Sequence, residues 1–116
     1  SRHDQIVAGI SHLPYLLSAM LMATISSQAE RDPAFWELAA GGFRDTTRLA
    51  ASDVTMMGDI LSTNTKAVAT LLAQFRMQLA MLETMLIAGD NQRLTESLKP
   101  IRLARKEWAE NYENKR

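Results

Sequence analysis

The stretch from Asp53 to Ala88, DVTMMGDILSTNTKAVATLLAQFRMQLAMLETMLIA, decides the fold class. Its apolar residues recur at spacings of three and four, the period that places side chains on one face of an α-helix. They are Met56, Ile60, Val68, Leu71, Leu72, Phe75, Leu79, Leu82 and Leu86. Ser52 or Asp53 is placed to cap this helix, and Gly89 to end it. The pattern predicts one long helix over residues 53–88.

The length of this predicted helix bears on the assembly. At the standard rise, a helix of about 36 residues is ~54 Å long. A compact domain of this chain length has a radius of gyration near ~13 Å. A helix that projects so far needs a partner, so we expect a homodimer with interlocking helices. The seven methionines suit such an interface, and they equally suit a monomer core as gap-fillers.

Two further helices are predicted on either side of this stretch. The first runs from about His3 to Gln28, and Pro14 inside it predicts a kink near residues 10–13, because proline lacks a backbone donor and crowds the preceding turn. The last runs from its cap Asp90 to Tyr112 with Pro100 mid-course. No alternating strand pattern of useful length occurs. The predicted fold class is all-α, with residues 1–116 as one helical domain.

The connections between the helices carry turn signals. Asp32 and Pro33 predict the cap and first position of a short helical turn over residues 35–38. Residues 39–52 form the least regular segment, in which Gly41 and Gly42 free the backbone before a polar run. A solvated loop has this composition.

Composition excludes several classes of protein. Thirteen Lys and Arg balance thirteen Asp and Glu, so there is no electrostatic reason to expect a nucleic acid or an anionic membrane as partner. The absence of Cys excludes disulfides and thiolate metal sites and fits a reducing, cytoplasmic compartment. The repeated strand–helix units and glycine fingerprint of a dinucleotide-binding fold are missing. The basic surplus of residues 99–116 predicts a solvated helix face rather than a binding patch.

One stretch, residues 5–29, is apolar enough to be weighed as a membrane span. Its apolar side chains fall on one stripe, and Gly9, His12 and Pro14 interrupt it, which favours a buried helix of a soluble protein. The chain opens on Ser1 rather than Met, and we therefore expect it to be a piece of a longer chain.

His12 is the first candidate for chemistry. Asp4, Ala8 and His12 share one helical face just before the proline. One interpretation is a helix histidine satisfied by a neighbour. The other is a hydrogen-bond donor to an anionic or carbonyl substrate in a kinked cleft. No metal-ligand spacing surrounds it, so no metal site is predicted.

The second candidate is the pair Arg44 and Arg48, four residues apart. A guanidinium holds its charge at all working pH values and grips a carboxylate at two points, as a small dicarboxylate substrate requires. Asp45 can orient one arginine and leave the other free. The alternative is an ion pair of Asp45 with either arginine that ties a loop down. Thr46 and Thr47 suit the start of a helix as caps.

Four short motifs in order resemble the C-terminal helical domain of prephenate dehydrogenases. They are His3-Asp4; Ser11-His12-Leu13-Pro14; residues 41–50, Gly-Gly-Phe-Arg-Asp-Thr-Thr-Arg-Leu-Ala; and Ser52-Asp53 with Asp59-Ile60 and Asn64. Each motif is weak by itself, and the ordered set over about the first 65 residues is strong.

The resemblance implies an enzyme of tyrosine biosynthesis. The family oxidatively decarboxylates prephenate to 4-hydroxyphenylpyruvate with NAD or NADP, and some relatives use arogenate. A dinucleotide-binding domain, N-terminal to the helical one and absent from this chain, carries the cofactor and the catalytic histidine. The helical domain dimerises and closes the substrate cleft. The chain alone is therefore expected to be inactive.

The resemblance also implies site residues. His12 corresponds to the histidine that helps hold the substrate side chain, and Arg48 to the arginine that grips a prephenate carboxylate. Tyr15 stands where the family commonly has a second histidine, and Met57 where it often has a tryptophan, so any aromatic wall there is replaced by a softer one. The possible supporting residues are Ser11, Tyr15, Gly42, Arg44, Asp45 and Met57.

Two other functions stay open at this point. A stand-alone helical dimer can bind a small carboxylate through Arg48 as a regulatory or interaction module. The chain can also belong to a different nicotinamide-dependent dehydrogenase.

Overall fold

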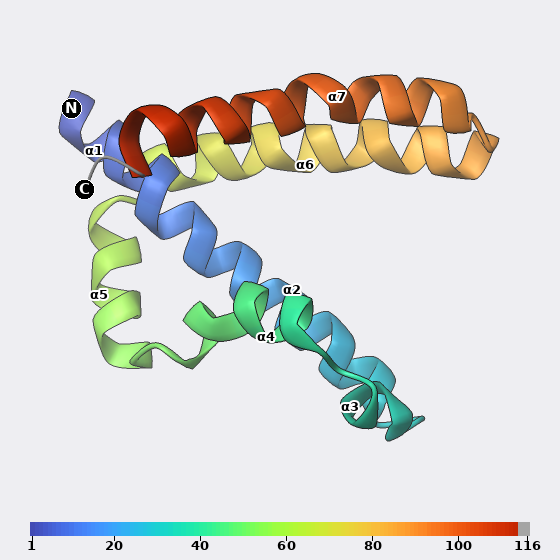
Figure 1. Ribbon diagram of the computed structural model, residues 1–116. Helices are drawn as coiled ribbons and strands as arrows, with labels where there is room; N and C mark the ends of the chain where they lie inside the picture. The colour runs from blue at the N-terminus through green and yellow to red at the C-terminus, as the bar shows by residue number, and fades with distance from the viewer. Residues whose placement is uncertain (114–116) are drawn as a thin grey trace. The chain divides into compact units, whose positions relative to one another are not determined.

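The computed structural model describes residues 1–113, and every regular element in that part of the chain is a helix (Figure 1). The predicted all-α class is therefore confirmed. The chain divides into two compact units, Ser1–Gln74 and Phe75–Arg116. In chain order the elements are α1 (Arg2–Val7), the π-helix η1 (Ala8–His12), α2 (Leu13–Ala29), α3 (Ala34–Glu37), α4 (Gly41–Thr47), the 3₁₀ turn η2 (Arg48–Ala51), α5 (Val54–Thr63), α6 (Thr65–Ala88), α7 (Asn91–Trp108) and the π-helix η3 (Ala109–Glu113).

The first three elements form one uninterrupted helical run, as predicted. Ser1 caps it, because its side-chain oxygen accepts a hydrogen bond from Asp4 N at 3.2 Å. The π-turn ends at His12, and Pro14 lies in the first turn of α2 that follows. Proline lacks the N–H that would bond to the carbonyl of Ile10, so a wider turn immediately before it is the local response to the missing donor. In the region of the predicted kink, residues 10–13, the structure thus has the end of this π-turn followed by the start of α2.

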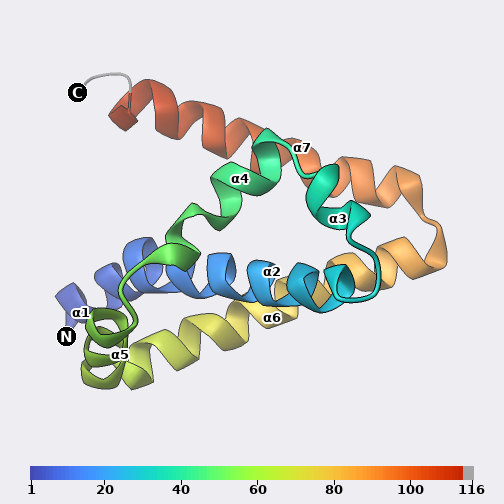
Figure 2. The same ribbon diagram turned by 90° about the horizontal axis from the view of Figure 1, so that it is seen from below.

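The chain returns along α2 after the predicted short turn. Asp32 Oδ1 accepts from Ala34 N at 3.0 Å, but the N-cap of α3 is Pro33 and its first residue Ala34, so the predicted cap Asp32 and first position Pro33 are each one residue too early. Figure 2 shows the chain leaving α2, turning through α3 and coming back through α4 toward α5. The predicted irregular segment is thus largely helical. Thr47 Oγ1 donates to Phe43 O at 2.7 Å in the last turn of α4, so the prediction of Thr46 and Thr47 as caps of a helix start is wrong.

The prediction of one helix over residues 53–88 is also wrong in one respect. Of the two predicted caps, Ser52 and Asp53, it is Asp53 that caps α5, with Oδ2 accepting from Met56 N at 2.8 Å. Asn64, however, has φ −133° and ψ 29°, which separates α5 from α6. Around it Ser62 and Thr63 donate to carbonyls three residues earlier, at 2.9 Å each. These small polar side chains compete for the backbone and make a helix end favourable.

Unit 2 is a two-helix hairpin made of residues 75–88 of α6 and of α7. Gly89 ends α6 with φ +68°, a conformation that glycine adopts without strain. Asp90 caps α7 as predicted, accepting from Arg93 N at 3.0 Å, and Pro100 lies inside α7 without ending it. Near the turn, Ser97 Oγ lies 3.5 Å from Met85 Sδ.

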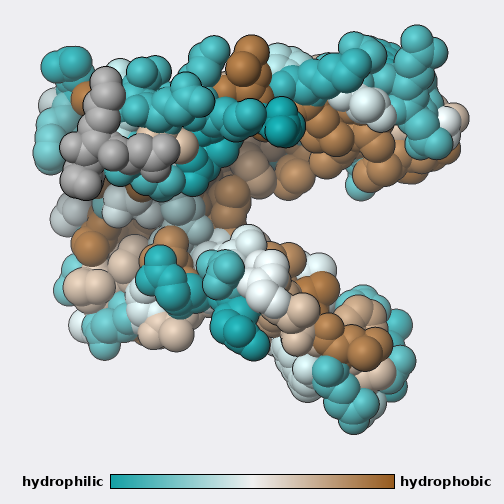
Figure 3. Space-filling view, in the orientation of Figure 1, coloured by the Kyte–Doolittle hydropathy of each residue, from teal (hydrophilic) through white to brown (hydrophobic). Residues whose placement is uncertain are grey.

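No described side chain of unit 2 is buried. Apolar atoms gather along the hairpin in the view of Figure 3. At the end of α7, Arg105 pairs with Glu113 at 3.3 Å and lies over the Trp108 ring at 4.6 Å. The basic tail is therefore an exposed helix face up to residue 113, and its last three residues lie outside the described part of the chain.

Candidate functional site

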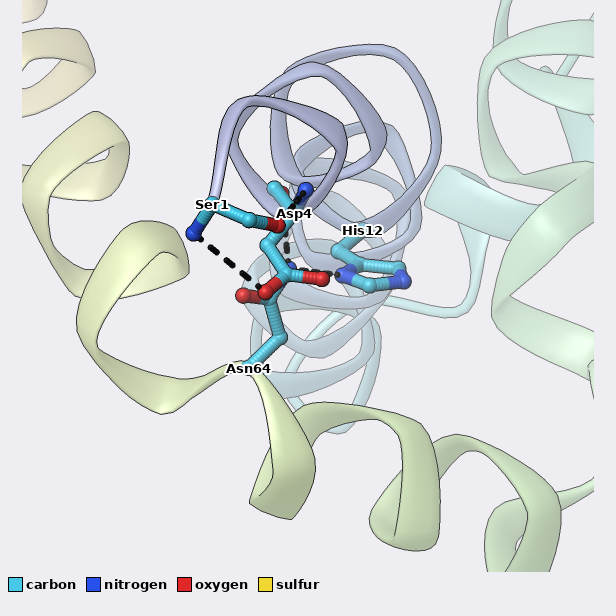
Figure 4. Close-up of polar contacts among 4 residues, drawn as sticks. All are labelled: Ser1, Asp4, His12 and Asn64. Carbon is cyan, nitrogen blue, oxygen red and sulfur yellow. Dashed lines mark hydrogen bonds and ion pairs between the residues drawn. The ribbon is translucent and has the colours of Figure 1, made fainter.

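His12 lies at the end of η1 and is only 6% exposed. Its Nδ1 lies 3.3 Å from Asn64 Nδ2. The same Asn64 nitrogen donates to Asp4 O at 2.9 Å, so one amide contacts Asp4 and His12, two of the three residues of the predicted shared face (Figure 4). The interpretation of His12 as a histidine satisfied by a neighbour is confirmed. The contact joins the first helical run to the α5–α6 junction within unit 1.

The other ring nitrogen of His12 is left available. No residue among 1–113 bonds to Nε2, and no buried side-chain nitrogen or oxygen of these residues lacks a partner. Nε2 therefore reaches the solvent-accessible surface. A histidine held on one side and open on the other can both support the fold and contact a ligand.

The Asp4 carboxylate lies beside this contact. Its pKa is below the ordinary value, first because of a hydrogen bond with the Ser1 side chain, while burial opposes that shift. The carboxylate is thus an anion at neutral pH.

Arg48 is the first residue of η2, and its side chain is exposed. The 3₁₀ turn is attached to α2 because Ala50 N donates to Ser18 Oγ at 3.0 Å, and Ser18 is only 2% exposed. No ion pair joins Asp45 to Arg44 or Arg48 in the described residues, so the predicted loop-fixing pair is absent. Neighbours on a helix point about 100° apart, which separates Asp45 from Arg44.

The supporting residues occupy three different environments. Ser11 is exposed and Tyr15 half-buried on the first helical run, while Gly42, Arg44 and Asp45 are exposed on α4. Met57 is 7% exposed and belongs to the small apolar core of unit 1.

Unit 1 contains two hollows of appreciable size. The larger, about 630 Å³, is polar and lies between α1 and the start of α6, where Asp4, Asn64 and Lys66 line it. The second, about 480 Å³, is apolar and lies among α2, α3 and α4. His12 and Arg48 line neither of these hollows.

A comparison with known families identifies the family of this chain. Residues 1–100 match the family model described as prephenate dehydrogenase, dimerization domain. The chain belongs to the prephenate dehydrogenase family. The resemblance seen in the sequence motifs is thereby confirmed.

Curated relatives agree with this assignment. The chain is 34% identical over 105 residues to a cyclohexadienyl dehydrogenase of Zymomonas mobilis, covering 89% of this chain and 36% of that protein. It is 31% identical over 90 residues to a prephenate dehydrogenase of Lactococcus lactis, covering 78% and 25%. The chain thus spans about a third or less of the relatives it matches.

Solved structures share the fold. The Synechocystis arogenate dehydrogenase matches with a TM-score of 0.85 and 28% identity, over 92% of this chain and 39% of the other. The prephenate dehydrogenase of A. aeolicus, in complex with hydroxyphenyl propionate and NAD+, matches with a TM-score of 0.81 and 30% identity, over 90% and 37%.

Two residues that shape the candidate site were not singled out as site residues in the sequence. Ser18 fixes the turn that carries Arg48, and Asn64 bonds to His12. A lone serine within an apolar helix gives no signal that its partner lies 32 residues away. The polar run of residues 62–65 inside an apolar pattern was a usable signal, because Ser, Thr and Asn favour helix ends.

Proposed function

We propose that this chain is the dimerization and substrate-binding part of an oxidoreductase that converts prephenate to 4-hydroxyphenylpyruvate in tyrosine biosynthesis. The observation that carries the proposal is the family match over residues 1–100. The relatives named prephenate and cyclohexadienyl dehydrogenase support it. The reaction removes a hydride and carbon dioxide from the substrate, so the enzyme needs a hydride acceptor.

The hydride acceptor we propose is NAD or NADP, held mainly by a separate N-terminal domain. Residues 1–113 contain no strand, and the sequence lacks the glycine fingerprint, so this part of the chain offers no dinucleotide cradle. The NAD+ complex of the A. aeolicus structure and the coverage of about a third of each relative support a cofactor-binding domain separate from this helical one. We assign residues 1–116 to the helical domain, which is inactive alone.

The role we assign to this chain's residues is to hold a substrate with two carboxylates. Arg48 is exposed, and no ion pair within the described residues occupies its guanidinium. It can therefore bind a carboxylate at two points. His12 presents its open Nε2 edge from the adjoining helical run. We assign supporting roles to the polar and small residues Ser11, Tyr15, Gly42, Arg44 and Asp45.

The test is steady-state kinetics on the gene product that contains this chain. Replacing Arg48 by Ala removes a bidentate contact to a carboxylate, worth about 1.5–3 kcal/mol, and should raise KM about 10- to 150-fold with a smaller fall in kcat. Arg31→Ala, an exposed arginine in the turn after α2, is the charge-matched control. A gene product that does not turn over prephenate or arogenate, or an Arg48 variant with unchanged KM, contradicts the proposal.

A second substrate has a specific observation in its favour. The Synechocystis structural neighbour is an arogenate dehydrogenase. Arogenate carries an amino group where prephenate carries a keto group, so it differs in charge at the side chain. Comparing kcat/KM for the two substrates distinguishes them.

We also propose that the domain forms a homodimer through unit 2. A pair of helices cannot bury an apolar face by itself, and exposed fractions reach 58% at Met81, 59% at Leu86 and 81% at Ile87. The family model is named for dimerization, which supports a second copy as the cover. We expect Met81→Asp to shift sedimentation toward the monomer, with Lys99→Asp on the polar surface as control. A monomeric wild-type protein at micromolar concentration would contradict this proposal.

The same proposal includes a cytoplasmic, membrane-free location. By length and composition alone, the helices Arg2–Ala29 and Thr65–Ala88 are both long and apolar enough to cross a membrane. In Arg2–Ala29, however, the buried polar residues His12 and Ser18 bond to other elements of unit 1. Such bonds support packing in a water-soluble domain. The neutral composition supports the absence of nucleic acid as a partner.

A further inference from the structure

The amide of Asn64 has a fixed orientation. One end of the amide lies 2.9 Å from the backbone carbonyl of Asp4. A carbonyl only accepts hydrogen bonds, so that end must be the NH₂ group and not the amide oxygen. The same nitrogen lies 3.3 Å from His12 Nδ1, and an NH₂ group has two hydrogens to give (Figure 4). Both contacts are therefore donated by Asn64.

This orientation fixes the proton on the imidazole. If Asn64 donates to Nδ1, then Nδ1 carries a lone pair and the proton of the neutral ring is on Nε2. Nε2 is the ring atom that has no partner among the described residues and reaches the surface. The open edge of His12 is thus an N–H donor. In the other tautomer the same edge would present a lone pair, which repels an anionic oxygen.

We propose that Asn64 is a positioning residue that holds His12 in its Nε2–H tautomer, so that the open edge donates a hydrogen bond to an anionic oxygen of the substrate. The inference rests on the proposed function, because it takes His12 as a substrate contact. The inference also assigns a role to the break between α5 and α6. The break places the Asn64 amide against His12 and Asp4 rather than in a regular helical turn.

The substitution Asn64→Asp tests the tautomer with little change in size. A carboxylate cannot donate to either partner, and it accepts instead from an Nδ1–H. At pH 9, where an ordinary imidazole is neutral, we expect wild-type His12 to be the Nε2–H tautomer and the Asn64→Asp variant to shift to Nδ1–H. Nitrogen-15 NMR of histidine-labelled gene product reads the two tautomers, and the signals lost in His12→Gln identify the residue. The control Asn91→Asp makes the same chemical change at the exposed start of α7.

The second measurement is binding of hydroxyphenyl propionate to the same proteins with NAD+ present. Loss of a hydrogen bond to a charged group should weaken binding by Asn64→Asp at least about tenfold, while Asn91→Asp binds as wild type does. Circular dichroism checks that helix content is kept. If Asn64→Asp does not fold, the wild-type NMR spectrum still decides the tautomer by itself.

The outcomes separate this inference from the proposed function. A wild-type Nδ1–H tautomer, or an Asn64→Asp variant with an unchanged tautomer, overturns the role of Asn64 whatever the binding result. A tautomer that shifts without loss of affinity, while Arg48→Ala still weakens binding, overturns the substrate role of His12 and leaves the proposed function standing. If Arg48→Ala, His12→Gln and Asn64→Asp all bind normally, both are overturned.

Discussion

Replacing Ser18 by Ala removes the contact that holds the Arg48 turn on α2. Ser18 Oγ is the acceptor for Ala50 N at 3.0 Å, and the serine is 2% exposed. An amide left without a partner costs about 1–3 kcal/mol when buried. Ala50 is half-buried, so water replaces part of the bond. Alanine also favours the helix by about 0.5 kcal/mol over serine. We expect a net loss of about 1 kcal/mol in the free energy of unfolding.

Urea unfolding of the gene product, followed by circular dichroism at one fixed protein concentration, measures this change. A loss of about 1 kcal/mol lowers the midpoint by about 0.5–1 M. The control Thr24→Ala removes an exposed bond from Thr24 Oγ1 to Met20 O in the same helix, and its midpoint should not fall. Because the turn carries Arg48, the KM for prephenate should also rise severalfold in Ser18→Ala. An unchanged midpoint in Ser18→Ala would refute the reasoning.

Two further predictions concern the ends of helices. Gly89 has φ +68°, so Gly89→Ala should lower the free energy of unfolding by about 1 kcal/mol. Gly58 lies inside α5, with open space where a Cβ would be added. Gly58→Ala should therefore raise the free energy of unfolding by about 0.5–1 kcal/mol. Equal effects of these two substitutions in urea unfolding would contradict the argument from backbone conformation. Asp90→Ala removes the acceptor for Arg93 N and should cost about 1 kcal/mol, measured in the same way, with Asp90→Asn, which keeps an acceptor oxygen, close to wild type.

Much of the fold could be predicted because its determinants are local. A cap and its amide lie within three residues of each other, so neighbouring residues alone were enough to assign Asp90 and to limit the cap of α5 to Ser52 or Asp53. The glycine that ends α6 and the short turn at Asp32 follow the same logic. Helical periodicity is local too, which is why the all-α class was predictable.

The remaining features depend on contacts between distant residues. The apolar pattern continues on both sides of Asn64, so periodicity alone predicts a continuous helix there. The break depends on what the Asn64 amide meets, and those partners lie 60 and 52 residues away. Likewise, the composition of residues 39–52 suggested a loop, while packing of α4 and η2 against α2 makes most of it helical. Intrinsic preference is a weak guide where such packing decides.

Two long-range hydrogen bonds, Ser18 with Ala50 and His12 with Asn64, explain how a unit with so little apolar core positions its candidate site. The buried apolar side chains are Ala8, Ala29, Met57 and Val68, of which two are alanines. The buried polar residues are Ser18 and His12, and each bonds to a different segment. Apolar contacts are non-directional and tolerate small shifts, whereas a hydrogen bond to a buried polar group fixes a position. The segment that carries Arg48 and the one that carries Asn64 are therefore placed by polar contacts, and a variant that loses either contact should affect substrate binding more than helix content.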